Sequence, residues 1–219
     1  MENVKHNIEV IRNKIADASK GKEVTLIGVS KTVSTDKIIS AYETGLRQFG
    51  ENKMQELTSK KEELAHLDIE WNFIGKLQKN KVKYAKQGVK MIQSVESLEL
   101  CEVIQKTMEN PIDVLLQVNI GKEPQKSGFN PDIVLESIEK MEKFDKIKVM
   151  GLMCIPPNVE NPDKYFMQMF DMYKKIQDME LPYAKMKYLS MGMSGDFETA
   201  IKCGSNMVRV GSSIFGKRL

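Results

Sequence analysis

The chain has 219 residues, of which 41% are hydrophobic, and its 33 basic and 30 acidic side chains leave a formal net charge of +3. This length suits one domain of α/β size with a sizeable core. So small a positive excess gives no indication of nucleic-acid binding. Three widely separated cysteines, Cys101, Cys154 and Cys203, lack metal-ligand spacing, which predicts free thiols in a reducing compartment.

No signal-type apolar segment opens the chain, and no run approaches the roughly 18 apolar residues that a membrane span needs. We therefore expect a cytoplasmic protein with neither membrane nor nucleic-acid partners.

The first predicted element is an amphipathic helix at 2–19, in which Val4, Ile8, Ile11 and Ile15 share one face and Gly21 ends the helix. Apolar runs then predict eight strands, at 24–31, 48–52, 71–75, 91–95, 112–119, 147–155, 188–193 and 207–211. Helical patterns follow nearly every strand, at 36–42, about 53–67, 76–88, 98–108, 131–144, 162–179 and 196–203.

Strict alternation of strand and helix implies parallel strands joined by right-handed crossovers. Eight such units in this length predict an α/β fold, a single-domain (β/α)8 TIM barrel over residues 1–219 with an extra N-terminal helix. A doubly wound open sheet is the alternative, but the turn after the first strand lacks a GxGxxG signature.

In a barrel the functional site lies at the carboxyl ends of the strands. Amide, hydroxyl and amine side chains and small residues dominate these ends, which deliver Lys31, Glu51, Asn52, Gly75, Lys76, Ser94, Asn119, Cys154, Ile155, Ser194, Gly195, Gly211 and Ser212. Histidine and close aspartate pairs are absent from this set. The pattern therefore argues against glycosidase pairs, metal hydrolysis and Ser-His-Asp chemistry.

Two glycine-serine turns, at 192–195 and 211–213, follow the last two strands. Such turns present clustered backbone N–H groups to a phosphate. Arg209 lies inside the last apolar run, where an unpaired guanidinium is costly. Its partner is either a ligand anion or ring, or a distant Asp or Glu across the barrel.

Lys31 is the first long polar side chain after the buried run VTLIGVS. Partial desolvation lowers the pKa of such a lysine and favours the free amine that forms a Schiff base. Together with the phosphate-type turns, Lys31 suggests an aldehyde-phosphate ligand such as pyridoxal 5′-phosphate (PLP). A barrel that binds another phosphorylated metabolite without a Schiff base is the alternative.

Eight short motifs then follow in order along nearly the whole chain, at 28–32 (GVSKT), 49–52 (FGEN), 71–75 (WNFIG), 77–81 (LQKNK), 151–156 (GLMCIP), 189–194 (LSMGMS), 208–211 (VRVG) and 214–216 (IFG). On these motifs the chain resembles the pyridoxal phosphate homeostasis proteins, single-domain relatives of the alanine racemase barrel. Two positions differ from the common pattern of that family: Asn72 stands where many members have histidine, and Ser212 where threonine is frequent.

The resemblance implies that Lys31 carries PLP as a Schiff base and that Asn52 lies near the cofactor ring. It implies that Arg209 lies against the cofactor, near either the pyridine nitrogen or the phosphate. The phosphate itself would be held by two pairs of turn residues, Ser194 with Gly195 and Gly211 with Ser212.

The resemblance also implies a monomeric carrier and regulator of PLP without evident turnover, with PLP-dependent apoenzymes as possible recipients of the cofactor. The alternative is a PLP-dependent, racemase-like enzyme. An arginine at the pyridine nitrogen would weaken the electron sink that racemisation needs. The second acid/base group of the barrel racemases is a tyrosine supplied by an added domain, which we expect this chain to lack.

Overall fold

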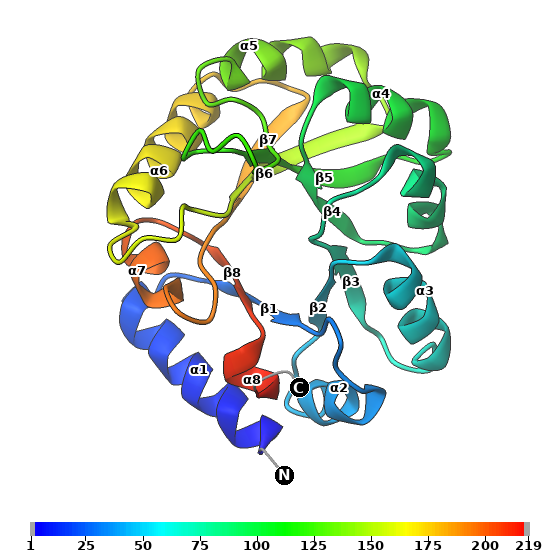
Figure 1. Ribbon diagram of the computed structural model, residues 1–219, viewed down its shortest axis with the longest axis vertical. Helices are drawn as coiled ribbons and strands as arrows, with labels where there is room; N and C mark the ends of the chain where they lie inside the picture. The colour runs from blue at the N-terminus through cyan, green and yellow to red at the C-terminus, as the bar shows by residue number, and fades with distance from the viewer. Residues whose placement is uncertain (1–2, 217–219) are drawn as a thin grey trace.

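Eight parallel strands close into a barrel in the computed structural model, which describes residues 3–216 (Figure 1). Each strand pairs with the next in chain order, and the last pairs with the first. The strands are β1 (Thr25–Val29), β2 (Gln48–Glu51), β3 (Glu70–Phe73), β4 (Met91–Val95), β5 (Ile112–Val118), β6 (Ile147–Cys154), β7 (Ala184–Ser190) and β8 (Met207–Val210). The predicted TIM barrel is thus confirmed, and the open sheet is excluded.

Helices surround the barrel (Figure 1). They are α1 (Val4–Ser19), α2 (Thr35–Tyr42), α3 (Met54–Glu63), α4 (Leu98–Thr107), α5 (Val134–Glu139), α6 (Asp163–Gln177), α7 (Phe197–Lys202) and α8 (Ser212–Phe215), with 3-10 helices η1 (Lys79–Gln87) and η2 (Lys140–Lys143). Within residues 3–216, none of the helices combines the length and the apolar character that crossing a bilayer demands.

Two predicted helices, at 76–88 and 131–144, differ from the structure. The first is the 3-10 helix η1, and the second divides into α5 and η2. In η1 the buried residues Val82 and Ala85 are three apart, and Met141 of η2 follows Ile138 by three. Because a 3-10 helix has three residues per turn, this spacing puts the buried side chains on one face.

The N-terminal helix α1 takes the outer position beside β8 and β1. Asn3 caps it by accepting a hydrogen bond from the His6 N–H at 3.1 Å, and its apolar face is buried. It lies against α7, α2 and the four-residue helix α8 (Figure 1), and the Asn7 side chain donates to the Ile214 carbonyl at 2.9 Å. The prediction of a helix at 2–19 holds from Val4 onward, since residue 2 lies outside the described range.

The predicted bounds of β7, 188–193, were wrong. The strand runs from Ala184 to Ser190, and the chain leaves the sheet after Ser190. In the first half of β7, buried Ala184 and Met186 alternate with exposed Lys185 and Lys187. One face of this half of the strand is therefore exposed to solvent. The apolar run that indicates a fully buried strand begins only after it.

The barrel interior is layered along the strands. Five apolar side chains from five strands fill the inner cluster: Ile27, Met91, Leu115, Met153 and Met207. Gln93 follows Met91 by two residues on β4, and Arg209 follows Met207 by two residues on β8. Both polar side chains are buried. Because strand side chains alternate with period two, the polar layer lies on the carboxyl side of the apolar one.

Candidate functional site

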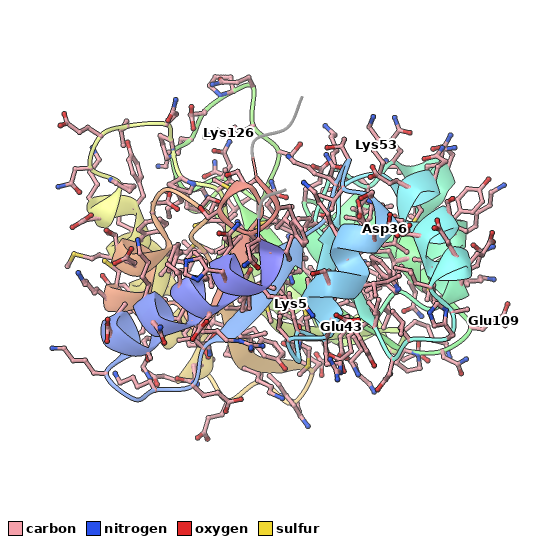
Figure 2. The ribbon with its side chains drawn as sticks, turned by 90° about the horizontal axis from the view of Figure 1, so that it is seen from below. Lys5, Asp36, Glu43, Lys53, Glu109 and Lys126 are labelled. Atoms are coloured by element: carbon pink, nitrogen blue, oxygen red, sulfur yellow. The ribbon has the colours of Figure 1, made fainter. Side chains whose placement is uncertain are left out.

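The predicted site residues follow neighbouring strands at one edge of the barrel. Lys31 is half-buried in the turn after β1, and Asn52 comes directly after β2. Ile27 of β1 pairs with Arg209 of β8, and Val29 pairs with Gly50 of β2. Arg209, Lys31 and Asn52 therefore lie on, or directly after, three neighbouring strands, β8, β1 and β2. Figure 2 shows the same edge from the side, with Lys53 after β2 and Lys126 after β5 both lying along it.

The two glycine-serine turns are joined by one hydroxyl. Ser194 Oγ accepts hydrogen bonds from the backbone N–H of Gly211 at 3.2 Å and of Ser213 at 3.4 Å. The backbone N–H groups of Ser194, Gly195 and Ser212 have no hydrogen-bond acceptor among residues 3–216. A cluster of unpaired backbone donors is what a phosphate group requires.

The turn that carries these unpaired N–H groups also has open space beside it. A Cβ added at Gly195 would meet no atom within 4 Å. Asp196 is the N-cap residue of α7, but its carboxylate accepts from the Met193 N–H at 2.6 Å instead of bonding to an N–H of the helix. This bond turns back across the loop, so it fixes the 193–196 turn that carries the open donors.

Arg209 is only 4% exposed, and its guanidinium is held by neutral oxygens. Nη1 donates to the carbonyl of Ser190 at 2.9 Å and to its hydroxyl at 2.7 Å, and Nη2 donates to the Cys154 carbonyl at 2.9 Å. These partners are not the distant Asp or Glu of the alternative interpretation. Burial lowers the pKa of Arg209. The Nε–H and the second Nη2–H have no acceptor in the described chain, so they are available to a ligand.

A hydrogen-bonded network of buried polar side chains crosses the barrel interior to Arg209, and sequence reasoning missed it. Ser190 Oγ donates to Gln93 Oε1 at 2.8 Å, and Gln93 Nε2 donates to Asn72 Oδ1 at 3.0 Å. Gln93 and Ser190 each lie inside an apolar strand run, MIQSV and YLS. A polar residue at an inward strand position was the signal that could have found them, because such a group needs a buried partner.

The layer between barrel and helices holds a second group that sequence reasoning missed. Lys60 of α3 is 7% exposed and donates to Glu51 Oε1 at 2.8 Å. Burial raises the pKa of Glu51, although hydrogen bonds from Lys60 and Ser30 act against it. Lys60 lies on the α3 face that carries Met54 and Leu57, and this spacing was a usable signal of a buried, paired lysine.

Cys154 is fully buried at the end of β6, and burial raises the pKa of its thiol to about 12. A thiol with so high a pKa is not a nucleophile at neutral pH. Cys154 is thus a small core residue. Its backbone carbonyl, which binds Arg209, is what connects it to the site.

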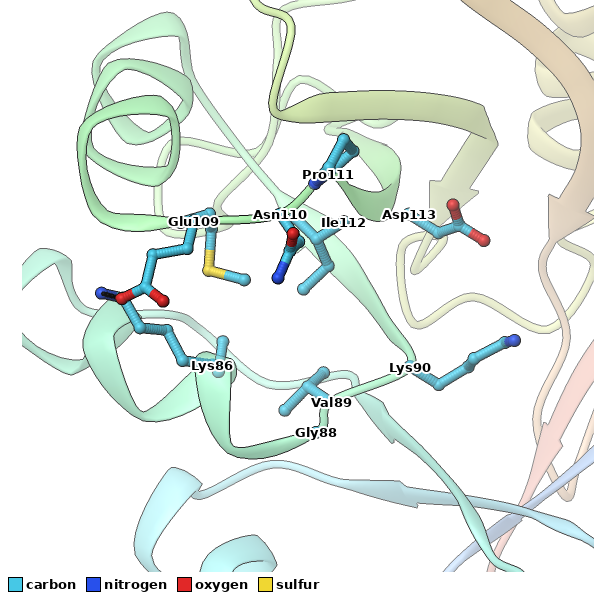
Figure 3. A pocket seen from close by; sticks show the side chains of 11 residues that line it. Lys86, Gly88, Val89, Lys90, Glu109, Asn110, Pro111, Ile112 and Asp113 are labelled. Atoms are coloured by element: carbon cyan, nitrogen blue, oxygen red, sulfur yellow. Dashed lines mark hydrogen bonds and ion pairs between the residues drawn. The ribbon is translucent and has the colours of Figure 1, made fainter.

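A cavity of about 330 Å³ lies elsewhere, near the amino ends of β4 and β5 (Figure 3). Lys86, Lys90, Glu109 and Asp113 are among its lining side chains, and Lys86 Nζ lies 2.8 Å from Glu109 Oε1. The functional side chains of a barrel gather at the carboxyl ends of its strands. This cavity is therefore separate from the candidate site.

Known proteins match the chain over nearly its whole length. The family model described as alanine racemase, N-terminal domain, matches residues 1–218. The pyridoxal phosphate homeostasis protein of Aquifex aeolicus is 40% identical over 227 residues, which cover 99% of this chain and 97% of the relative. The solved structure of PipY from Synechococcus elongatus with PLP bound is 30% identical, with a TM-score of 0.86 over 97% of this chain and 100% of PipY.

A more distant match concerns the fold alone. Alanine racemase from Corynebacterium glutamicum is 15% identical, with a TM-score of 0.79 over 99% of this chain and 62% of the racemase. The full-length identity to the homeostasis proteins is far higher. This chain therefore belongs to the pyridoxal phosphate homeostasis protein family, whose members share the barrel of the alanine racemase N-terminal domain.

Proposed function

We propose that the chain, as one domain over residues 1–219, binds PLP at the carboxyl ends of β8, β1 and β2 and serves in PLP homeostasis. Lys31 holds the aldehyde carbon, and Asn52 lies beside the ring. The phosphate is bound at two pairs of turn residues, Ser194 with Gly195 and Gly211 with Ser212.

The observation that carries this proposal is the Ser194 hydroxyl, which accepts from the backbone N–H groups of Gly211 and Ser213. It joins the turns after β7 and β8, so the remaining N–H donors of both turns belong to one hydrogen-bonded loop pair. Three such donors lack acceptors, and the space at Gly195 is open. A phosphate monoester, with its strong acceptor oxygens, suits this donor set.

Arg209 supports an aromatic, phosphorylated ligand. Its Nε–H and one Nη2–H can still donate, while its other bonds fix the guanidinium. We assign these free donors to the pyridine nitrogen, because the unpaired N–H groups of Ser194, Gly195 and Ser212 already supply donors to the phosphate. A guanidinium there disfavours protonation of that nitrogen.

Lys31 would hold PLP through its amine, and the cofactor would supply the aldehyde for a reversible condensation that releases one water molecule. The names of the relatives and the PLP-bound PipY structure support this choice of cofactor. The turns orient the phosphate, and Arg209 orients the ring edge. The chain thus keeps a reactive aldehyde away from stray amines.

We propose a carrier and not an enzyme. A guanidinium at the pyridine nitrogen weakens the electron sink that racemisation uses. Racemisation by two bases also needs a second acid/base group. Tyr173 donates to the Met186 carbonyl, and Tyr188 packs against the inner apolar cluster. Tyr188 lies within β7 and not at the start of a strand as predicted.

Absorbance spectroscopy tests the cofactor and its anchor. Incubation with PLP is expected to give a violet-region band, and borohydride is expected to fix the label on the peptide that contains Lys31. Lys31→Ala should abolish the band, whereas Lys53→Ala, at the same edge of the barrel, should keep it. Absence of the band in the wild-type protein would refute the Schiff-base proposal. The alternative would then be a barrel that binds another phosphorylated metabolite.

Amino-acid racemase assays on the PLP-loaded protein test the carrier proposal, for which no turnover above free PLP is expected. Sustained turnover that depends on Lys31 would establish the racemase-like alternative. A monomeric state, cytoplasmic location and delivery of PLP to apoenzymes stay predictions. Light scattering tests the first, cell fractionation the second, and reactivation of a PLP-free enzyme the third.

A further inference from the structure

Side chains of α3 hold both peptide groups that flank Lys31. Lys60 Nζ donates to the Ser30 carbonyl at 2.6 Å, and the Thr32 N–H donates to Glu56 Oε1 at 2.5 Å. The Ser30 carbonyl belongs to the peptide before Lys31, and the Thr32 N–H to the peptide after it. The backbone on each side of the Lys31 Cα is therefore bonded to the same helix.

Lys60 joins these two bonds into one network. Besides the Ser30 carbonyl, its ammonium donates to Glu51 Oε1 at 2.8 Å and Glu56 Oε1 at 2.7 Å, so its three N–H groups are all used. Glu51 also accepts from Ser30 Oγ at 2.6 Å. We call the side chains of Glu51, Glu56 and Lys60 the α3 clamp.

The α3 clamp carries a large desolvation cost for a network that would serve only to stabilise the fold. Glu51 is fully buried, and its Oε2 has no hydrogen-bond partner in the described chain. A buried ion pair with an unsatisfied oxygen is often no better for stability than apolar packing of the same volume. Local geometry is therefore a better reason for this network than stability is.

The backbone that the α3 clamp holds is strained. Thr32 has φ +60, a left-handed conformation that β-branched residues rarely adopt. Strain of this kind persists only where surrounding contacts over-determine it, and it concentrates at functional sites. The bond to Glu56 is such a contact. Burial tends to raise the pKa of Glu56, but hydrogen bonds from Lys60 and the Thr32 N–H lower it overall, which keeps the acceptor charged.

We propose that Lys60 and Glu56 are positioning residues that fix the Lys31 backbone so that its amine meets the aldehyde of PLP. This inference rests on the proposed role of Lys31. Loss of either contact should slow Schiff-base formation by about 10- to 100-fold, the range expected when a reacting group is displaced by about 1 Å. Binding at the phosphate turns should not change, because those turns follow other strands.

Two ligands separate these effects. PLP can react with Lys31, whereas pyridoxine 5′-phosphate carries an alcohol in place of the aldehyde and can only bind non-covalently. Lys60→Met and Glu56→Ala are expected to slow the reaction with PLP, measured by stopped-flow absorbance. Calorimetry should give wild-type affinity of both variants for pyridoxine 5′-phosphate. Glu56→Gln, whose amide oxygen can still accept from the Thr32 N–H, should restore most of the rate.

The control is Lys61→Met, since Lys61 is the next residue on α3 and its ammonium donates to the Gln87 carbonyl outside the site. Its rate should equal that of the wild type. Equal losses for PLP and pyridoxine 5′-phosphate would mean that Lys60 and Glu56 only support the fold and would overturn the proposal, as would unchanged rates in both variants. If wild-type protein formed no Schiff base at Lys31, the proposed function itself would fail, and that result is distinct.

Discussion

Replacing Gln93 by leucine tests the hydrogen-bonded network of polar side chains that crosses the barrel. The leucine is close to glutamine in size, but it removes the donor to Asn72 Oδ1 and the acceptor of the Ser190 hydroxyl. Both groups are buried, and each orphaned group costs about 1–3 kcal/mol. Burying leucine in place of an amide recovers about 1–2 kcal/mol. The free energy of unfolding should therefore fall by about 3 kcal/mol.

Urea unfolding measures this loss, because Trp71 is the single tryptophan and is only 2% exposed, so its fluorescence follows the core. Gln117→Leu is the matched control, since half-buried Gln117 donates to the Ser127 carbonyl of a loop, and it should cost about 1 kcal/mol or less. Asn72→Leu combined with Gln93→Leu should cost less than the sum of the two single changes, by about 1 kcal/mol. Additive losses, or a Gln93→Leu loss no larger than the control, would refute the reasoning.

The pairing register of β6 shifts between Val149 and Gly151, and this shift and the cysteines give two more predictions. Gly151→Ala would put a Cβ 1.8 Å from the Tyr188 carbonyl oxygen at φ +147, so strain and overpacking of about 1–3 kcal/mol each should lower the melting temperature. Gly21→Ala, at φ +84 with no atom within 4 Å, should cost only about 1 kcal/mol, and equal effects would contradict the clash. Maleimide labelling at pH 7, followed by mass spectrometry, should modify part-exposed Cys203 first and spare native Cys154, whose thiol pKa of about 12 keeps it protonated; early labelling of Cys154 would contradict its burial.

The strands could be predicted because a parallel barrel buries most of them on both faces. Runs such as TLIGV in β1 and IDVLLQV in β5 are then mostly apolar and lack strict alternation. Prediction of strands from apolar runs failed at β7, where Lys185 and Lys187 face water while Ala184 and Met186 are buried. Prediction from apolar spacing also failed for η1, whose single buried face has the spacing of a 3-10 helix, because the same few apolar residues fit an α-helix about as well.

The site could be predicted in part for a related reason. Residues that follow strands reach a common edge in any such barrel, so Lys31, Ser194 and Gly211 could be brought together from chain order alone. Interactions between a strand and a helix depend on side-chain direction across two elements, which chain order does not give. The pairing of Lys60 with Glu51 therefore needed coordinates, and so did the neutral oxygen partners of Arg209.

The strand β1, which leads to Lys31, lies between two polar layers of different kinds. On the inner side of the barrel, neutral oxygens hold Arg209, whose Nε–H and second Nη2–H have no acceptor in the described chain. On the outer side, Lys60 and Glu56 bond to each other and to the backbone on each side of Lys31. Charge balanced within the protein can hold a backbone without attracting the ligand, whereas an unbalanced cation can attract it. Because β1 separates these layers, Lys60 and Glu56 hold the Lys31 backbone from the helix side, away from the layer that holds Arg209.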